Sequence, residues 1–355
     1  MSGATFGSVF QLSTFGESHG QAMGGIIHGC PAGVSLNLEH IQGALNRRRP
    51  GQSAVTSTRN EVDEVEFLSG IYQGKTTGTP IGFIIKNKDQ RSEDYEQLTT
   101  VYRPSHADLT YEQKYGHRDP RGGGRASARE TVNWVVAGAI AEQLLNQLGI
   151  TLTAYVDQIG NVRFRSSSSF DLEAIEASMV RCPDPESSDK MIALIEETRA
   201  EGDTLGGAIH LSINGVPAGL GEPVFNKLHA ALGHAMLTIN AVKGVEFGSG
   251  FDAISMKGSE HNDLYNTDFT TQTNHAGGIQ GGISNGMPIT LRVAFKPVAT
   301  LMKDQVSINK AGAQETILAK GRHDVCVVPR AVPIVQAMAA MVILDAYLLN
   351  KRVSL

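Results

Sequence analysis

The stretch Ser127–Gly149, SARETVNWVVAGAIAEQLLNQLG, is the most strongly patterned part of the chain. Ser127 and Glu130 have the spacing of a capping box, in which a serine and a glutamate three residues later satisfy the first backbone N–H groups of a helix. An apolar-rich run follows and reaches Leu148, and the next residue is a glycine, which commonly ends a helix. The stretch therefore predicts a helix with both ends marked.

Apolar runs on both sides of this helix predict strands and further helices. Runs of alternating or continuous apolar residues bounded by glycine and proline are typical of strands. Strands are expected at about Gly24–His28, Val65–Ser69, Ile81–Lys86, Leu152–Ile159, Gly207–Ile213, Val245–Phe247 and Ile289–Phe295. Helices are expected at Asn37–Arg49, Ser188–Ala200 and Ala331–Asn350. The irregular alternation favours an α+β fold over a doubly wound parallel sheet.

Length and charge restrict the class of protein. The 355 residues contain no linker-like stretch and no repeat of fixed period, so residues 1–355 are predicted to form a single domain. The formal net charge of −5, from 31 basic and 36 acidic side chains, argues against binding nucleic acid by general phosphate neutralisation. Any anion that the protein binds must therefore meet a local basic cluster.

The remaining composition points to a reducing cytoplasm. The three cysteines are odd in number, far apart and without C-x-x-C spacing, and no helix pairs histidine with carboxylate at metal-ligand spacing, so we expect neither disulfides nor a metal site. The N-terminus lacks the pattern of a secretory signal. Asp345 interrupts the apolar stretch Ala331–Leu349, and with Pro333 in its first turn this favours a buried helix over a membrane span.

Two glycine-rich segments resemble nucleotide motifs without matching them. Gly70–Thr76 is one residue short of a phosphate loop, and Gly122–Ser127 has serine at the third glycine position of the dinucleotide fingerprint. The second segment still opens a capped helix, whose N-terminal N–H groups attract anions. Because Arg121, Arg125 and Arg129 flank it, an anion site is favoured over a set of solvated surface arginines.

A second basic cluster precedes a long acid-free stretch. Arg47, Arg48 and Arg49 are consecutive, Arg59 follows, and no carboxylate occurs before Glu61. Four arginines without a neutralising carboxylate repel one another unless a polyanion accepts them. Taken alone the run could be a solvated face, but with the first cluster it strengthens the prediction of an anion site.

Three histidines in polar motifs are candidates for acid–base chemistry. His19 lies in GESHG, His106 follows Arg103-Pro-Ser, and His323 precedes Asp324. A histidine can transfer a proton near neutral pH, and a phosphate that leaves as a dianion benefits from such a donor.

Nine segments spread along the whole chain resemble the chorismate synthase family. They are FGESHG (15–20), RRRPG (47–51), RPSHAD (103–108), YGHRDPRGGGRASARET (115–131), SINGVPAGLGEP (212–223), INAVKGVEFGSGF (239–251), GGIQGGISNGMPI (277–289), KPVATL (296–301) and RHDVCVVPRAVPI (322–334). The resemblance implies one α+β domain, a β-α-β sandwich with helices packed between antiparallel sheets, and a homotetramer.

The resemblance also implies an activity. The family converts 5-enolpyruvylshikimate 3-phosphate into chorismate by 1,4-anti elimination of phosphate, the last common step of the shikimate pathway toward the aromatic amino acids. It is a carbon–oxygen lyase acting on phosphates, and it requires reduced FMN although the reaction has no net redox change.

Residue roles are carried over motif by motif. His19 would protonate the departing phosphate with Ser18 beside it, His106 would protonate or stabilise the reduced flavin near N1, and Asp324 would assist removal of the ring proton through flavin N5. Ser127 is expected to join these catalytic residues. Substrate anions would be bound by Arg48, Arg49, Arg59, Arg103 and Arg129. Flavin contacts would come from Arg125, Ala126, Ser127, Asn240, Ala241, Gly281, Lys296, Pro297, Val298, Ala299, Thr300 and Arg322.

The charges of these ligands agree with the arginine clusters. Substrate and reduced FMN together bring roughly six negative charges into one pocket, and an unpaired buried anion costs several kcal/mol. The clusters are therefore expected to converge on a single cavity. Three positions depart from the family pattern: Ala54 stands where many members have arginine, Ala126 where serine is common, and Trp134 where arginine is frequent. We interpret Trp134 as a packing residue.

The sequence leaves two other functions as alternatives. A flavin reductase or NAD(P)H oxidoreductase is the first alternative, since some family members reduce their own flavin with NADPH. This chain has no Rossmann motif, so we expect it to depend on an external flavin reductase. A non-catalytic anion- or RNA-binding module is the second alternative, and the acidic balance and sparse aromatic residues argue against it.

Overall fold

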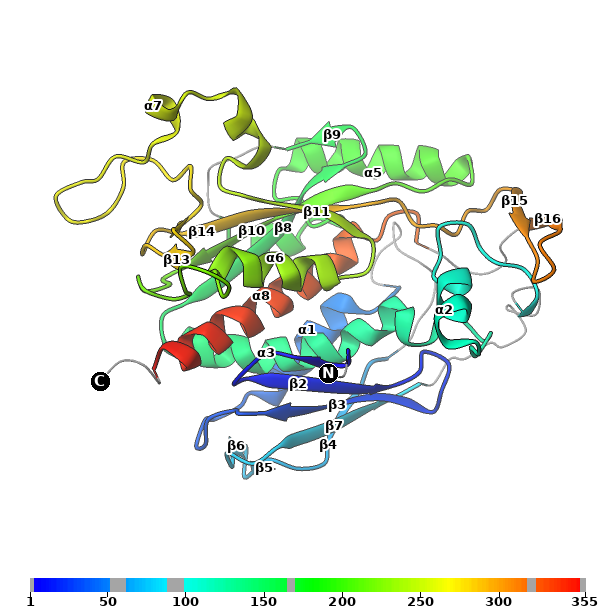
Figure 1. The fold of residues 1–355 in the computed structure, drawn as a ribbon, viewed down its shortest axis with the longest axis horizontal. Helices are drawn as coiled ribbons and strands as arrows, with labels where there is room; N and C mark the ends of the chain where they lie inside the picture. Colours follow the sequence, from blue (N-terminus) through cyan, green and yellow to red (C-terminus); the bar gives the residue numbers. More distant parts are fainter. Residues whose placement is uncertain (1–2, 52–61, 88–98, 165–169, 318–323, 352–355) are drawn as a thin grey trace.

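Two antiparallel sheets enclose a layer of helices. We analysed a computed structural model, which describes residues 3–51, 62–87, 99–164, 170–317 and 324–351. The first sheet has the strand order β1-β2-β3-β7-β4, and the second has the order β11-β14-β10-β8-β9. Figure 1 shows the first sheet below the helices and the second above them. The predicted α+β class, with helices between antiparallel sheets, is confirmed.

The first sheet is built from the N-terminal quarter of the chain. Its strands are β1 (Thr5–Phe6), β2 (Gln11–Gly16), β3 (Ala22–His28), β4 (Val65–Phe67) and β7 (Ile81–Lys86). Strand β7 alternates most clearly between buried and less buried residues, with Ile81, Phe83 and Ile85 facing the helices. This alternation gives the sheet one apolar face on which the helices pack.

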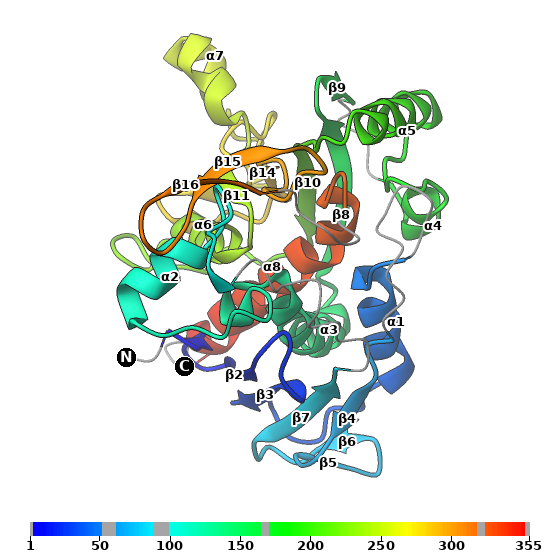
Figure 2. The ribbon, with the colours of Figure 1, turned by 90° about the vertical axis from the view of Figure 1, so that its right-hand side faces the viewer.

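The second sheet comes from the middle of the chain. Its strands are β8 (Thr151–Ile159), β9 (Val162–Arg163), β10 (Gly207–Asn214), β11 (Val242–Phe247) and β14 (Ile289–Phe295). Ile209, Leu211 and Ile213 of β10 face the helices, whereas His210 between them faces outward. The two sheets therefore present their apolar faces to the same helical layer (Figure 2).

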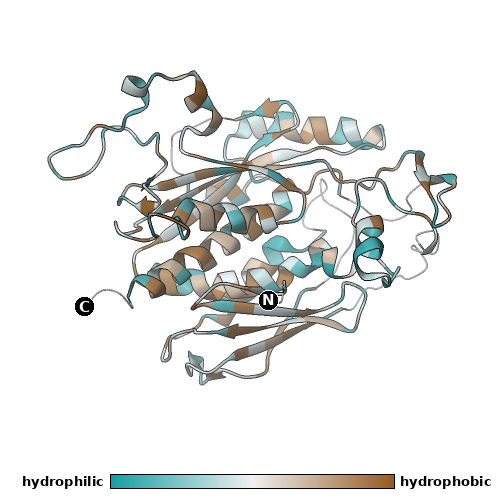
Figure 3. Ribbon diagram, in the orientation of Figure 1, coloured by the Kyte–Doolittle hydropathy of each residue, from teal (hydrophilic) through white to brown (hydrophobic). Residues whose placement is uncertain are grey.

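Four helices fill the space between the sheets: α1 (Leu38–Arg48), α3 (Thr131–Gln147), α6 (Leu228–Thr238) and α8 (Val328–Asn350). The brown segments of α3 and α8 in Figure 3 mark this apolar interior, whereas α2 (Asp108–Tyr115) is largely teal. A Cβ on Gly138 of α3 would lie 2.3 Å from the Cβ of Ala337 on α8. Only glycine therefore allows the two central helices to pack this closely.

Smaller elements surround these layers. The remaining helices are α4 (Leu172–Glu176), α5 (Pro185–Ala200), α7 (Gly258–His261), and the 3-10 turns η2 (Gly124–Ala126), η3 (Ala128–Glu130) and η4 (Gly250–Ser255). Two-stranded sheets pair β5 (Ile71–Tyr72) with β6 (Lys75–Thr76), β12 (Ile279–Gln280) with β13 (Ile283–Ser284), and β15 (Gln305–Ile308) with β16 (Gln314–Ile317).

The predicted helix at Ser127 begins differently from the expectation. Ser127 accepts a hydrogen bond from the N–H of Arg129 and caps a 3-10 turn, and the α-helix starts only at Thr131. Glu130 does not complete a capping box, because its carboxylate pairs with Arg125 at 2.6 Å. The serine cap was thus predicted correctly and the glutamate's role was not.

Several other boundaries also differ. The strand predicted at Val65–Ser69 ends at Phe67, and the one predicted at Val245–Phe247 begins at Val242. The helix predicted from Ser188 begins at Pro185, where the Asp184 side chain caps it. Pattern reasoning also missed β2 (Gln11–Gly16), α2 and α6, whose apolar residues are interrupted by polar ones.

The C-terminal helix begins at Val328, three residues earlier than predicted, so Pro333 lies inside it rather than in its first turn. Among the described residues this helix alone has the length and hydropathy of a membrane span, but most of it is buried against the second sheet and the helices α1, α3 and α6. Asp345 interrupts its apolar face because the carboxylate accepts hydrogen bonds from the N–H groups of Ser8, Val9 and Phe10. The helix is a core helix, as predicted.

Candidate active site

Segments far apart in the sequence line one cavity of about 430 Å³ between the helical layer and its flanking loops. The volume lies within the range of roughly 300–1,000 Å³ that is typical of small-molecule sites. Among its lining residues are His19, Arg48, Arg103, Ser105, His106, Ala126, Ser127, Asn240, Ala241, Lys296, Val298, Ala299, Thr300, Asp324 and Arg330. Most of the described residues to which the family resemblance assigns roles are thus brought together.

Other residues to which the resemblance assigns roles lie beside the cavity or away from it. Ser18, Arg125, Arg129 and Pro297 are neighbours of lining residues in sequence and are not themselves among those that line it. Arg49 is half-buried at the end of α1 and is likewise not among them. Arg59, Arg322, His323 and Ala54 lie outside the described residues.

Gly281 lies in the exposed turn of the β12–β13 hairpin. In Figure 1 the label of β13 is near the left side of the fold and that of α2, which directly follows His106, is near the right. Among the described residues, those that line the cavity include none from this hairpin. Gly281 therefore does not line the cavity of its own chain.

His19 forms one wall of the cavity. It lies in the loop between β2 and β3, is 7% exposed, and places Nδ1 3.0 Å from the Ser18 hydroxyl oxygen. The glycine turn after α2 packs against its ring: a Cβ on Gly122, where φ is +102°, would lie 2.5 Å from the imidazole. Gly122 therefore allows close approach to His19, a role that the nucleotide motifs did not suggest.

His106 and Arg103 share a buried carboxylate, Asp108, at the start of α2. The Nδ1 atom of His106 lies 2.9 Å from Oδ1 of Asp108, and Arg103 donates from Nε to Oδ2 at 2.8 Å. Burial alone would raise the pKa of Asp108, but the hydrogen bonds from Arg103 and His106 hold it well below its usual range. Asp108 is therefore a stable anion that orients both side chains, a role that the sequence reasoning missed although the residue ends the RPSHAD motif.

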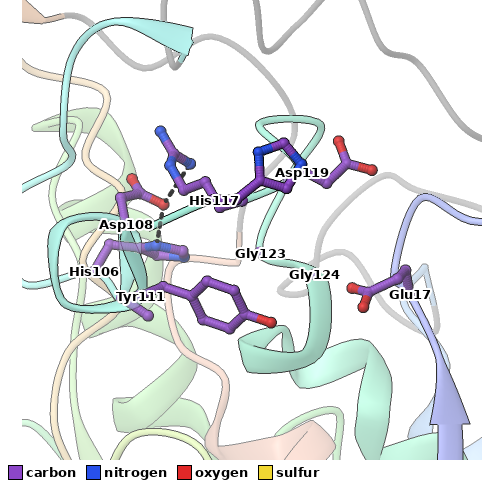
Figure 4. Close-up of a pocket in the computed structure, with 11 residues that line it drawn as sticks. Glu17, His106, Asp108, Tyr111, His117, Asp119, Gly123 and Gly124 are labelled. Carbon is purple, nitrogen blue, oxygen red and sulfur yellow. Dashed lines mark hydrogen bonds and ion pairs between the residues drawn. The ribbon is translucent and has the colours of Figure 1, made fainter. Parts of the chain in front are cut away.

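A smaller cavity of about 280 Å³ adjoins the first and shares His106, Ala107 and Gly123 with it. Figure 4 shows His106 linked to Asp108, with Tyr111 and Glu17 lying further along the same pocket. Burial raises the pKa of the Glu17 carboxyl, while the nearby Arg125 opposes the shift. His106 thus lies at the junction of an electropositive cavity and a second, more acidic one.

The floor of the main cavity joins α1 to the start of α3. Arg48 is 3% exposed, and Asp63, with no exposed surface, accepts from its Nη1 at 3.0 Å and also pairs with Arg129. Burial lowers the pKa of Arg48 to about 10, which still leaves the guanidinium charged at neutral pH. Asn87 accepts from Nε of Arg129 at 3.0 Å and donates to backbone oxygens of the loop that carries His19.

Asp324 and Arg330 face the cavity from the start of α8. Their side chains form an ion pair, and Nε of Arg330 donates to the backbone oxygen of Arg48 at 3.2 Å. The sequence reasoning assigned no role to Arg330, although it lies in the RHDVCVVPRAVPI segment. Because Arg330 contacts Arg48, an early and a late part of the chain meet at this point.

Asn240 and Lys296 close the cavity on the side of the second sheet. Asn240 donates from Nδ2 to the backbone oxygen of Ala126 at 3.0 Å, and the backbone N–H of Lys296 donates to Ala241. Partial burial lowers the pKa of Lys296, with a further contribution from Lys243. The first bond attaches the η2 turn to the loop after α6, and the second attaches that loop to the end of β14.

The lining is electropositive. Four cationic side chains, Arg48, Arg103, Lys296 and Arg330, face it with one carboxylate, Asp324, and two histidines. Arg125 instead points toward β2, where it pairs with Glu130 and donates to the Thr14 hydroxyl at 2.7 Å. The other glycine motif, Gly70–Thr76, forms the β5–β6 hairpin and is not followed by a helix, so its rejection as a phosphate loop is confirmed.

Trp134 packs against the hydrophobic core and is not among the residues that line the cavity. Its interpretation as a packing residue agrees with this position. The three cysteines are free and buried, and burial raises the pKa of Cys30 to about 11. A thiol with such a pKa is protonated and unreactive at neutral pH.

Helices enclosed by two antiparallel sheets, with a cationic cavity that also holds histidines and a carboxylate, define an α+β protein whose cavity is suited to an anionic small molecule. The family model described as chorismate synthase matches residues 10–348. The chain is 60% identical over 352 residues to the chorismate synthase of Christiangramia forsetii, which covers 99% of each chain. It is 58% identical over 355 residues to that of Bacteroides thetaiotaomicron, again covering 99% of each chain.

A solved structure, described as the crystal structure of chorismate synthase, has the same fold. It superposes with a TM-score of 0.77 at 32% identity, covering 97% of this chain and 92% of the other. The chain belongs to the chorismate synthase family.

Proposed function

We propose that the chain catalyses the 1,4-anti elimination of phosphate from 5-enolpyruvylshikimate 3-phosphate, giving chorismate at the last common step of the shikimate pathway. The observation that carries the proposal is the convergence of His19, His106, Asp324 and the cationic side chains on one cavity. A substrate with two carboxylates and a phosphate needs several cations, and planar guanidinium groups bind both kinds of anion.

The residues on the second-sheet side of the cavity fit reduced FMN. The amide oxygen of Asn240 is buried and accepts no hydrogen bond from the described residues, and a flavin ring carries N–H groups that could supply one. Lys296, Val298, Ala299 and Thr300 line the same side, where the ammonium group of Lys296 would face a phosphate. Ala126, Ser127 and Ala241 complete the proposed flavin set, together with Pro297 and Arg322. Arg125, which pairs with Glu130 in this structure, would have to turn toward the cavity to join them.

The chemistry that reduced FMN supplies when bound is a transient donation of electron density to the substrate as the C–O bond breaks. His19 would donate a proton to the departing phosphate, with its ring held by Ser18 and Gly122. His106, held by Asp108, would keep a proton beside the flavin. Asp324, which also lines the cavity, would assist removal of the ring proton. The Ser127 hydroxyl, at the cavity edge, would join this set.

Arg48, Arg103 and Arg129, with Arg49 and Arg59, would bind the substrate's anionic groups. Since Arg48 and Arg129 meet on Asp63, their charges are held close together behind one part of the cavity. This concentration explains how a chain of net charge −5 can bind a multiply charged anion.

We further propose that the active form is a homotetramer in the cytoplasm, where free buried cysteines are stable. Two observations support association. Phe225, Ile254 and Phe269 are 93%, 81% and 88% exposed, and association with other subunits would cover such apolar side chains. Gly281 lies away from its own cavity, so a flavin contact by this residue requires the hairpin of a neighbouring subunit.

The test is an anaerobic assay with photoreduced FMN and 5-enolpyruvylshikimate 3-phosphate. Chorismate absorbance and free phosphate should rise together in a one-to-one ratio. Oxidised FMN without photoreduction is the control and should give no product. Phosphate release without chorismate would indicate simple hydrolysis and contradict the proposal.

A further inference from the structure

Two of the arginines proposed to bind substrate anions, Arg48 and Arg129, pair with the same carboxylate, Asp63. No role in the reaction has been given to Asp63 so far. We propose that Asp63 is a positioning residue, which holds Arg48 and Arg129 in fixed orientations behind the cavity wall so that they are ready for an anionic substrate. The inference rests on the proposed function for the identity of that anion.

The contact geometry is that of a bridge. Nη1 of Arg48 donates to Oδ2 of Asp63 at 3.0 Å, and Nη1 of Arg129 donates to Oδ1. The side chains of Arg48, Asp63 and Arg129 are 4%, 0% and 7% exposed. Each carboxylate oxygen therefore serves one arginine, and water has little access to the group.

The carboxylate of Asp63 reduces the electrostatic repulsion between Arg48 and Arg129. Two buried guanidinium groups at this separation repel each other strongly, since the interior screens charges poorly. One carboxylate between them reduces the summed charge of the three groups from +2 to +1, which relieves the repulsion and still leaves an attraction for an anion. Burial raises and the two arginines lower the pKa of Asp63, with a net lowering, so it is ionised at neutral pH.

Other hydrogen bonds hold the planes of the two guanidinium groups. Arg48 donates from Nε to the Thr131 hydroxyl at 3.1 Å and from Nη2 to the backbone oxygen of Ala128 at 3.0 Å. Arg129 donates from Nε to Asn87 at 3.0 Å. A guanidinium has five N–H groups, so the terminal nitrogens of Arg48 keep donors for a ligand in the cavity.

The backbone at Asp63 is anchored without its carboxylate. The side chain of Gln42 donates to the backbone oxygen of Asp63 at 2.8 Å, and β4 begins two residues later. The segment therefore has its own attachment to α1 and to the first sheet. This separates the role of the charge from the placement of the chain.

The test compares Asp63→Asn with wild type in the anaerobic assay. Asparagine keeps the size of the side chain but offers one acceptor oxygen and no charge, so one arginine loses its partner. We expect KM for 5-enolpyruvylshikimate 3-phosphate to rise about 10- to 100-fold, with kcat changed much less. Glu66→Gln, which removes a surface carboxylate paired with Lys86, is the matched control and should leave both constants unchanged.

A double variant distinguishes positioning from a general structural effect. If Asp63 acts through the two arginines, then Asp63→Asn raises the KM by a smaller factor in Arg129→Ala, where only Arg48 remains, than in wild type, whereas independent effects would multiply. Asp63→Glu retains the charge one methylene further out and should recover part of the affinity. Thermal denaturation of each variant verifies that it is folded.

Three results would overturn the inference: an unchanged KM in folded Asp63→Asn, fully multiplicative effects in the double variant, or unfolding of both Asp63 variants while Arg129→Ala remains folded. Calorimetric titration with inorganic phosphate separates the inference from the proposed function. Weaker phosphate binding by Asp63→Asn would support positioning even if the wild-type protein gave no chorismate, a result that would contradict only the proposed reaction.

Discussion

His19 lies where two distant parts of the chain meet, and its surroundings are built for close contact. The ring is held on one side by Ser18 and on the other by the glycine turn at Gly122. A proton donor needs this kind of fixed orientation, because general acid catalysis depends on the distance to the leaving group.

Replacing His19 with alanine should lower kcat by ~10²–10⁴, because the departing phosphate would leave without a positioned proton donor. The anaerobic assay with photoreduced FMN measures the effect. His40→Ala removes a histidine that is 40% exposed and pairs with Glu142 on the surface, so it serves as the control. A His19→Ala enzyme as fast as the control would remove His19 from the mechanism.

Gly122→Ala should also slow turnover, although residue 122 carries no reactive group. The new Cβ would lie 2.5 Å from the His19 ring, so the imidazole must move, and a displacement of about 1 Å can cost up to about 100-fold in rate. Gly219→Ala is the matched control, because φ is +103° there and no atom lies within 4 Å of the new Cβ. Equal kcat values for the two variants would show that the strain, and not contact with His19, limits the enzyme.

At the scale of elements, the packing of α3 on α8 joins the two sheets. Gly138→Ala would place a Cβ 2.3 Å from that of Ala337, and overpacking of this kind costs ~1–3 kcal/mol. Thermal denaturation should therefore show a lower Tm. Gly43→Ala in α1, where nothing lies within 4 Å, should instead be neutral or stabilising, because alanine favours a helix. A higher Tm for Gly138→Ala would mean that the helices can separate without loss.

The outer face of the second sheet carries a row of polar residues in register across four strands. His210 on β10 lies opposite Tyr155 on β8 and Arg292 on β14, which in turn lies opposite Glu246 on β11. Burial, with a contribution from Arg292, lowers the pKa of His210 from 6.5 to about 4. The folded chain therefore keeps this histidine neutral where the unfolded chain would protonate it.

This pKa predicts how stability depends on pH. The unfolded chain binds the extra proton as the pH falls below 6.5, so the free energy of unfolding should decrease between pH 6.5 and 4 by up to about 3 kcal/mol from this group. Denaturant unfolding at several pH values measures the loss. His210→Gln should lose correspondingly less stability over the same interval, and a slope identical to that of wild type would contradict the assignment.

At the scale of the whole molecule, cationic side chains gather at one cavity although the chain is acidic. Nothing in the described residues resembles a dinucleotide fold, since both main sheets are antiparallel and the helices lie between them. The enzyme should therefore take its reduced FMN from elsewhere. Anaerobic incubation with NADPH and FMN should leave the flavin absorbance unchanged unless a separate flavin reductase is added. Rapid bleaching by the protein alone would favour the bifunctional alternative.

The sequence by itself determined the family, the α+β class and most of the residues around the cavity. These features could be predicted because they depend on residues close together in the sequence. Strand β7 is marked by its apolar run, and the helix after Ser127 by its apolar residues and by the residues at its two ends. Motifs such as GESHG and RPSHAD bring a reactive group and its local support together in a few residues, so His19, His106 and Arg103 could be found from them.

Only the tertiary structure decided which partner each charge takes. Asp63, Asp108 and Arg330 acquire their roles from side chains on other elements or on another turn of the same segment, and Glu130 turns from the expected helix cap to Arg125. The physical reason is that a buried ion must be neutralised by whatever charge lies within a few ångströms, and that neighbour is chosen by packing rather than by proximity along the chain.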